Sequence, residues 1–496
     1  MNPLVPLKRR TPLFLAALAS CAISPMAQAV SPPPDGGYPG ENTAEGDAAL
    51  FSLTSGSANT AIGFHALFSN TTGSFNTATG DFALAGNTTG LQNTANGNDA
   101  LESNTTGNFN TANGESALQA NTAGSSNTAT GVDALVKNTT GNFNTGTGTN
   151  ALQNNSTGSN NTAHGFDALY NNTTGLDNTA NGFQALFNNT TGGGNTATGF
   201  NALLSNTTGE FNTATGVFAL QHNSIGFGNT ASGEEALDLN TTGNFNTASG
   251  FAALVRNTSG DNNTASGFRA LARNKTGGNN TANGQNALGQ NRSGSFNIAL
   301  GAEAGAELTT GDNNIDIGNV GVADEGNTIR IGTQGTQTKT FIAGVSDAAI
   351  GGMEVRVNQN GRLGTEPSSE RFKEAIKPMD NASKAILALK PVTFRYKKEI
   401  DAAGISQFGL VAEEVERVNP DLVVRDKEGK PYTVRYDAVN AMLLNEFLKE
   451  HRKVQKLEAA LAAMDRRLKA QDAKIERVNE KVEVIKPAPL AVLNDK

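Results

Sequence analysis

An asparagine recurs every 17 residues along most of the chain, from Asn42 to Asn314, without a single insertion. The 17 copies follow the pattern NTAxGxxALxxNTTGxx, and the apolar Ala-Leu pair is present in the first 15 copies, from Ala49-Leu50 to Ala287-Leu288. Copies of one length must stack in one orientation, so this strict period predicts a mainly β repeat solenoid over residues 42–330.

Short Thr/Ala stretches, such as residues 76–79, predict the strands of the solenoid. They are bounded by Gly80 and later by Gly90, which is typical of a brief strand followed by turns that need permissive backbone angles. The next segment, Asp81 to Leu84, fits either a second short strand or one helical turn, and the sequence leaves both open. Asparagine at fixed positions is typical of left-handed turns and of side-chain ladders between coils.

The apolar content of each copy is small, since one Ala and one Leu recur at the paired positions. A coil with so thin a core buries little surface alone, so we expect three chains to share it in a homotrimer of the β-roll or β-helix kind. Phenylalanines at the sixth repeat position are expected to supply part of that contact: Phe64, Phe166, Phe183, Phe200, Phe251 and Phe268.

The pattern changes after the array. Residues 327–332 and 340–345 alternate like strands that close the open edge of the solenoid, and residues 359–367, rich in Gly, Asn and Pro, predict a linker. We therefore expect a transition and linker over 331–367 and a small α+β domain over 368–445. Only 8 Lys or Arg residues lie between 42 and 345, whereas 27 lie between 346 and 496, which supports a change of domain.

The sequence pattern of the small domain predicts two helices and two strands, followed by a final long helix. The expected helices are Ser369 to Leu389 and Val411 to Val418, the strands are Val392 to Tyr396 and Tyr432 to Tyr436, and helix follows Asp437. A seam with alternating spacings of three and four predicts a trimeric coiled coil over 446–485, with Gln471 as one polar position. Its members are His451, Val454, Leu457, Leu461, Met464, Leu468, Gln471, Ile475, Val478, Val482 and Ile485.

Composition excludes several functions. The charged fraction of 17% is low for an enzyme of this size, and the net charge of -8 argues against a nucleic-acid partner. The repeats hold no recurring Asp/Glu pair or His cluster, so a hydrolase acting on an external polymer is the least favoured function. The sequence predicts no cofactor and no metal site.

The N-terminus predicts export. Residues 1–29 contain Lys8, Arg9 and Arg10, then an apolar run over 13–23, then Ala27-Gln28-Ala29, as in a secretory signal peptide. The run is too short for a stable membrane span, and none is expected elsewhere. The single cysteine, Cys21, lies in a Leu-Ala-Ser-Cys sequence that resembles a bacterial lipobox, so cleavage after Ala29 and lipidation of Cys21 both remain open.

Two resemblances sharpen the functional hypothesis. The repeats resemble the head repeats of trimeric autotransporter adhesins, whose period is usually shorter, and this implies a rigid spacer or an adhesive surface with a host-cell or other surface ligand. Residues 367–460 resemble the intramolecular chaperone domain at the C-termini of phage endosialidases and tail fibres. That resemblance rests on 368–376, 389–396 and 409–415, with Pro420, Leu422-Val423 and Tyr436-Asp437.

The chaperone resemblance implies that the domain trimerises its passenger and then cuts the bond between Pro367 and Ser368. It places the motif serine and lysine at Ser368 and Lys373, while Ser369 stands where the family commonly has Asp. A serine hydroxyl attacks an amide when a base removes its proton, and a lysine made neutral by burial can be that base. Five residues apart on one helix they would diverge by about 140°, so we expect Ser368 to precede the helix.

Three functions from different classes therefore stand beside one another. The first is a secreted or surface fibre, adhesin-like, with a self-cleaving trimerisation domain. The second is the same fibre with a domain that trimerises but does not cut, in which Ser368 or Ser369 caps a helix and Lys373 is a solvated charge. The third is the polymer hydrolase.

Overall fold

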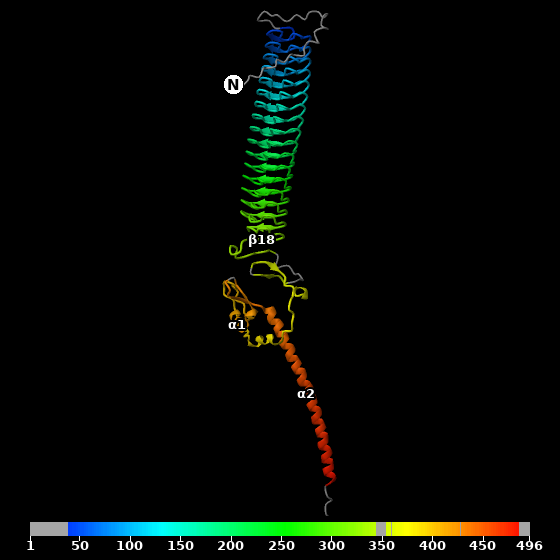
Figure 1. Cartoon of the computed structure of the whole chain (residues 1–496), viewed down its shortest axis with the longest axis vertical. Coiled ribbons are helices and arrows are strands. Elements are labelled where there is room, and N and C mark those ends of the chain that lie inside the picture. Colours follow the sequence, from blue (N-terminus) through cyan, green and yellow to red (C-terminus); the bar gives the residue numbers. More distant parts are fainter. Residues whose placement is uncertain (1–37, 344–353, 359, 427, 486–496) are drawn as a thin grey trace, which may run out of the picture. The chain divides into compact units, whose positions relative to one another are not determined.

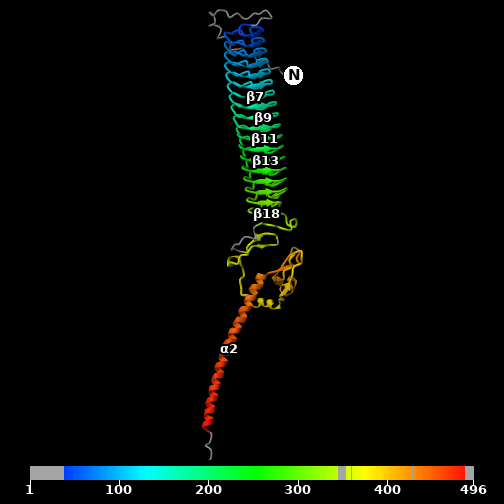
Figure 2. The ribbon, with the colours of Figure 1, turned by 180° about the vertical axis from the view of Figure 1, so that it is seen from behind.

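The computed structural model describes residues 38–343, 354–358, 360–426 and 428–485, which leaves the predicted signal and Cys21 outside. The chain divides into two compact units, 1–339 and 340–496, which are described separately. In the first unit every coil contributes one short strand to a single parallel sheet, and each strand pairs with those of the coils before and after it (Figures 1 and 2). The predicted repeat solenoid is therefore confirmed.

The strands of the solenoid are three residues long throughout. They are β1 Thr43–Glu45, β2 Thr60–Ile62, β3 Thr77–Thr79, β4 Thr94–Asn96, β5 Thr111–Asn113, β6 Thr128–Thr130, β7 Thr145–Thr147, β8 Thr162–His164, β9 Thr179–Asn181, β10 Thr196–Thr198, β11 Thr213–Thr215, β12 Thr230–Ser232, β13 Thr247–Ser249, β14 Thr264–Ser266, β15 Thr281–Asn283, β16 Ile298–Leu300, β17 Ile315–Ile317 and β18 Ile329–Ile331. Successive strands pair in equivalent register, as Ala78 with Ala95, so the rise per coil is about 4.8 Å.

The segment after each strand is a turn, neither of the two alternatives that the sequence left open. In one coil Phe82 and Leu84 take left-handed backbone angles, with φ of 55° and 52°, and Gly80 has φ 133°. A Cβ at Gly80 would collide with the carbonyl oxygen of Gly97 in the next coil, so the glycine is required there. The left-handed Leu84 directs its side chain into the coil, where it is fully buried.

Two ladders of buried asparagines run through the solenoid. In one, the Asn76 amide nitrogen donates to Asn59 Oδ1 at 3.2 Å and to the Gly90 carbonyl at 2.8 Å. In the other, Asn87 donates to Asn70 Oδ1 at 2.7 Å. Each buried amide thus bridges neighbouring coils, which supplies the polar partners that a buried side chain needs and confirms the predicted ladders.

The core of each coil is closed within one chain. The Ala and Leu side chains of the interior coils, such as Ala185 and Leu186, are 0% exposed. The expectation that three chains share this apolar surface is therefore wrong, because Leu, two Ala and two Asn of each coil fill the interior within a single chain. The sixth-position Phe residues are exposed and stack on one another, as Phe166, Phe183 and Phe200 do at ring distances of 5.5 and 5.1 Å.

The last coil departs from the repeat. Asp316 takes the place of the strand alanine in β17 and is 1% exposed, although neither carboxyl oxygen has a hydrogen-bond partner among the described residues. Burial, together with the charge of Glu325, raises the pKa of Asp316 to about 6 against the opposite effect of Arg330. Arg330 in β18 is paired with Glu325, with Nη2 and Oε2 2.7 Å apart.

The edge strands are confirmed in part. The alternation over 327–332 becomes β18, whereas residues 340–343 form no strand and Gly344 and Val345 lie outside the described residues. The linker predicted over 359–367 contains part of a short antiparallel pair.

The second unit contains small two-stranded sheets and a long terminal helix, α2 (Figure 1). Its elements are β19 Arg356–Val357, β20 Leu363–Gly364, the 3-10 segments η1 Glu370–Phe372 and η2 Asp380–Ala388, β21 Val392–Phe394, β22 Gln407–Gly409, α1 Ala412–Val418, η3 Pro420–Leu422, β23 Val423–Arg425, β24 Pro431–Val434 and α2 Tyr436–Val484. The predicted strand near 392, the helix near 411 and the final helix are confirmed. Tyr436 begins α2 instead of ending a strand.

The helix predicted over Ser369 to Leu389 is wrong, since the chain forms η1 and η2 with an irregular stretch between them. Pro378 lies in that stretch, and a proline disfavours helical angles in the residue before it and lacks an amide hydrogen. Between the described ends of the chain, no helix is long and apolar enough to cross a bilayer.

Candidate functional site

Ser368 and Lys373 lie on opposite sides of η1. Ser368 is in the irregular segment before it and Lys373 follows it directly, so one 3-10 turn separates them. The short turn folds the lysine back, and Lys373 Nζ donates a hydrogen bond to Ser368 Oγ at 3.2 Å. A hydroxyl and an amine at this distance can exchange a proton.

The capping alternative is not what this segment forms. Ser369 occupies the residue before η1, but its side chain makes no capping hydrogen bond. Ser368 and Lys373 are both exposed in the single chain, and so are the neighbouring motif residues Phe372 and Ile376, at 58% and 63%. The pair therefore lies beside two exposed apolar side chains, and the Arg371 guanidinium lies over the Phe372 ring, 4.7 Å from its centroid.

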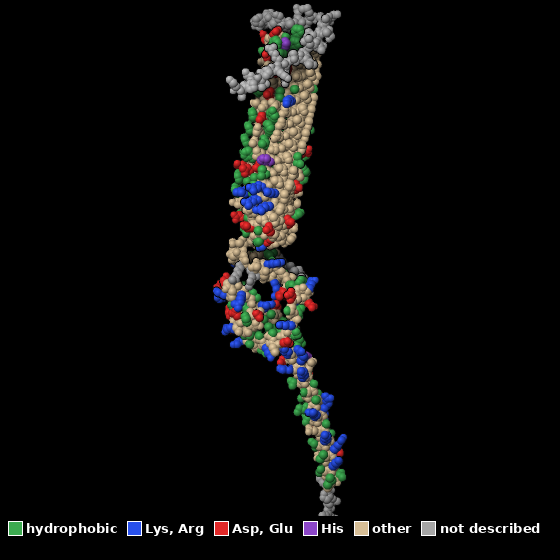
Figure 3. Space-filling model, viewed as in Figure 1, with side chains coloured by type: hydrophobic (Ala, Val, Ile, Leu, Met, Phe, Trp, Pro, Cys, Tyr) green, Lys and Arg blue, Asp and Glu red, His purple; other side chains and the backbone are tan. Residues whose placement is uncertain are grey.

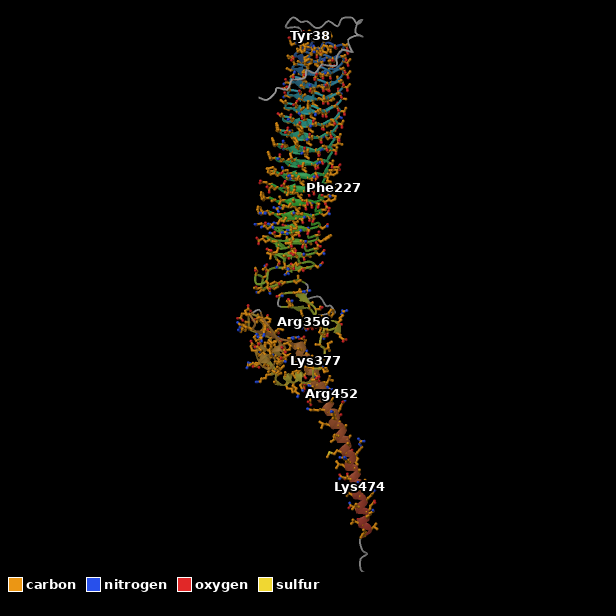
Figure 4. The ribbon with its side chains drawn as sticks, viewed as in Figure 1. Tyr38, Phe227, Arg356, Lys377, Arg452 and Lys474 are labelled. Atoms are coloured by element: carbon orange, nitrogen blue, oxygen red, sulfur yellow. The ribbon has the colours of Figure 1, made fainter. Side chains whose placement is uncertain are left out.

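The segment on the other side of the Pro367–Ser368 bond contacts one arginine, Arg356, which is labelled in Figure 4. Arg356 Nη1 lies 2.7 Å from Glu366 Oε2 and 3.6 Å from Asp437 Oδ2 at the start of α2. These exposed ion pairs connect the residues before the bond with those after it. Each is worth about 0–1 kcal/mol, so they orient the segment more than they hold it.

Distant motif pieces of the second unit meet around Gly409. The Leu410 amide donates to Tyr436 Oη at 3.0 Å. A Cβ at Gly409 would lie 2.8 Å from Tyr436 Oη and 3.1 Å from Phe394, so no larger residue fits between them. Motif residues that are far apart in the sequence thus pack together where β21, β22 and α2 meet.

A second serine–lysine pair, Ser383 with Lys449, could not be predicted from a local motif, because 66 residues separate its members. Ser383 is fully buried, its Oγ donates to Glu446 Oε1 at 2.5 Å, and Lys449 Nζ lies 3.0 Å from the same Oγ. Hydrogen bonds from Lys449 and Ser383 hold the pKa of Glu446 below its usual range. Both Ser383 Oγ and Lys449 Nζ donate to the Glu446 carboxylate, so this cluster anchors η2 to α2.

Among the residues that the structure describes, no group of three or more His, Cys, Asp or Glu side chains is placed to hold a metal ion. Neither the curated proteins nor the solved structures contain a match to the chain. One family model does match: that of the chaperone of endosialidase, over residues 368–424, a region that begins at Ser368 and ends within β23.

Proposed function

We propose that this protein is a secreted or surface-displayed fibre whose C-terminal region assembles three chains and then cuts the bond between Pro367 and Ser368. The observation that carries the proposal is the hydrogen bond of 3.2 Å between Lys373 Nζ and Ser368 Oγ, inside the segment similar to the endosialidase chaperone. The rigid solenoid is the passenger, and the repeats offer the exposed surface expected of a fibre.

The proposed cut is an acyl shift followed by hydrolysis. Neutral Lys373 takes the Ser368 hydroxyl proton, Oγ attacks the Pro367 carbonyl carbon, and the peptide bond breaks as the Ser368 nitrogen takes the proton back. The resulting ester between Pro367 and Ser368 Oγ is opened by water. The products are a passenger ending at Pro367 and a fragment of residues 368–496.

Assembly is the proposed trigger. Lysine acts as a base only when it is neutral, and burial favours the neutral form. Because Ser368, Lys373, Phe372 and Ile376 are exposed in one chain, burial has to come from partner chains. Cutting is therefore coupled to correct trimerisation.

The same exposure supports a second candidate function. If partner chains cover Phe372 and Ile376 but leave Lys373 in water, the domain trimerises the fibre without cutting it. This alternative has the same fibre and the same trimerisation domain as the first candidate function, and it differs only in that the Pro367–Ser368 bond is not cut.

The test is intact-mass analysis of purified protein held at neutral pH. Wild type is expected to yield the 368–496 fragment, whereas Ser368→Ala and Lys373→Ala remain full length and still assemble. Ser369→Ala, next to the nucleophile and outside the dyad, is the matched control and is expected to cut. Processing of Ser368→Ala at the same bond would refute the dyad, and an intact wild-type trimer after days would leave the non-cutting fibre.

The same mass spectrum tests export and anchoring. A mature N-terminus at Val30 indicates cleavage after Ala29, whereas a diacylglyceryl mass on Cys21 indicates a lipoprotein. Secretion itself is tested by fractionation, and an unprocessed Met1 in the cytosol would contradict the surface function.

A further inference from the structure

Positive charge in the solenoid is concentrated at two repeat positions. Six Lys or Arg residues lie between 42 and 314, and five of them occupy the eleventh or thirteenth position of a copy. Four of these lie on three consecutive coils: Arg256 and Arg273 at position eleven, and Lys275 and Arg292 at position thirteen. Figure 3 shows Lys and Arg side chains gathered on one face of the solenoid, with Asp and Glu side chains above and below them.

These four side chains, here called the cationic patch, project from stacked rungs. The Lys275 amide donates to the Arg292 carbonyl at 2.8 Å, and Arg273 Nη1 donates to Gln290 Oε1 at 2.5 Å in the neighbouring coil. All four are exposed, and within the described residues none forms an ion pair. Asp324 is near enough to Arg292 for that charge to contribute to its lowered pKa, but its own hydrogen bonds go to Thr309 and Thr310.

The fold does not require these charges. Several other copies carry Asn or Ser at position eleven and most carry Thr at position thirteen, and their coils close with the same core. Like charges on adjacent rungs, about 4.8 Å apart, repel one another and lower stability. A cluster that costs stability and serves no packing role points to an anionic ligand.

The same two rows form a polar groove nearer the N-terminus, and two copies, with His222 and Leu239 at position eleven, separate it from the patch. A hollow of about 550 Å³ lies between a wall of position-eleven side chains, from Lys137 to Ser205, and a wall of position-thirteen threonines, Thr173, Thr190 and Thr207. Lys137 Nζ donates to Asn154 Oδ1 at 2.6 Å, and Asn154 donates to Asn171 at 3.0 Å. The groove thus presents amides and hydroxyls along about 20 Å of the solenoid axis.

We propose that the cationic patch and this groove form one binding track for an acidic polysaccharide that lies extended along the solenoid. The patch holds carboxylate or sulfate groups, and the amides and threonines of the groove bond sugar hydroxyls. One coil rises about 4.8 Å, which is close to the length of one sugar residue in an extended chain, so successive rungs meet successive sugars.

A nucleic acid fits this track less well. Duplex DNA carries one charge per about 1.7 Å and its binders neutralise about 6–10 phosphates, whereas four cations cover three coils here and the net charge of the chain is -8. The polar groove also offers hydroxyl partners instead of more cations.

The experiment measures binding of purified full-length protein to polygalacturonate, with neutral dextran and duplex DNA as competitors. A consensus variant replaces Arg256 and Arg273 by Asn and replaces Lys275 and Arg292 by Thr, residues that other copies carry at these positions. It is expected to fold as wild type by circular dichroism and to lose affinity for polygalacturonate at least tenfold. Asn171→Ala with Asn188→Ala tests the groove and is expected to weaken binding by about threefold.

The matched control is Arg269→Asn, which removes a cation from the coil that also carries Arg273 but at repeat position seven. It is expected to leave the affinity within twofold of wild type. Equal binding of dextran, unchanged affinity in the consensus variant, an equal loss with Arg269→Asn, or tighter binding of DNA than of polygalacturonate would each overturn the proposal.

This inference deepens the proposed surface function, because it names the class of ligand that the fibre displays. It rests on the proposed function in one respect: the solenoid has to be displayed outside the cell to meet such a ligand. Binding is measured on purified protein, so its failure is distinguishable from a failure of assembly or cutting.

Discussion

The solenoid and the C-terminal region satisfy their apolar side chains in opposite ways. Interior coils bury an Ala-Leu pair completely within one chain, as Ala202 and Leu203 show. Among the described residues of the second unit, four apolar side chains are buried, Val415, Leu422, Val423 and Val434, while α2 leaves residues such as Leu461 and Leu468 71% and 50% exposed.

The difference shows where partner chains are needed. A repeat array is stabilised by the contact of each coil with its neighbours. Many stacked coils therefore bury the apolar surface that one thin coil cannot bury alone. The second unit has no such repetition, and an apolar surface left exposed along a helix is typical of an interface. The solenoid closes its core within a single chain, and we propose that assembly completes the C-terminal region.

The largest effect is expected from breaking the period of the solenoid. Removing one whole copy, Asn178 to Gly194, keeps every ladder in register and is expected to leave secretion and protease resistance unchanged. Removing only Asn178 to Ala185 places unlike positions opposite one another and is expected to destroy both. Equal behaviour of the two deletions in limited proteolysis would contradict the self-sufficient coil.

The next effect concerns the seam of α2. Leu461→Asp combined with Leu468→Asp places charge in the predicted coiled-coil core and is expected to abolish the trimer in light scattering. Ala463→Asp, on the same helix but off the seam, is the control and is expected to assemble. The solenoid of the double variant should keep its β-sheet signal; loss of both together would show that the two regions are not independent.

A smaller effect is expected from one rung of a buried ladder. Asn172→Ala removes the hydrogen-bond partner of Asn155 Oδ1, whereas the Asn189 side-chain amide keeps its bond to the Gly192 carbonyl and the Gly175 carbonyl keeps its bond from Asn161. One unsatisfied buried acceptor costs about 1–3 kcal/mol, measurable as faster hydrogen exchange in that coil. Asn171→Ala, in the part-exposed ladder beside it, should change exchange little; equal effects would show that the buried ladder carries no special stability.

The smallest effect depends on pH. Because burial raises the pKa of Asp316 to about 6, the native protein binds this proton more tightly than the unfolded chain does. Wild type therefore loses stability as the pH rises from about 4 through 6. Asp316→Ala restores the repeat alanine and is expected to stabilise this end by about 2 kcal/mol at pH 8, after allowance for solvent screening, with a smaller gain at pH 4. Hydrogen exchange over 315–331 checks it, and a pH-independent gain would exclude the carboxyl as its cause.

The period of the solenoid was predictable because the first 15 copies repeat the same Ala-Leu pair at the same positions. The left-handed Leu84 was not, since a leucine carries no sequence signal for that conformation and takes it only because stacked coils impose it. Pro378 was sufficient to predict the break between η1 and η2, but the apolar pattern around it favoured a continuous helix.

The candidate site shows the same division. The local pair Ser368 and Lys373 followed from the resemblance to the chaperone domain, and one short turn brings the two side chains together. The anchoring cluster of Ser383, Glu446 and Lys449 did not, because its members meet only after α2 packs on η2. Local chemistry could be predicted from the sequence, whereas contacts between distant elements required the fold.

The most direct test of the account is to measure assembly and cutting together. Light scattering and denaturing mass spectrometry are applied to wild type and to the Leu461→Asp, Leu468→Asp variant over the same days at neutral pH. The account predicts a three-chain mass and the 368–496 fragment for wild type, and a single-chain mass with an intact chain for the variant. A monomeric wild type, or a monomeric variant cut at the wild-type rate, would contradict the claim that partner chains complete the C-terminal region.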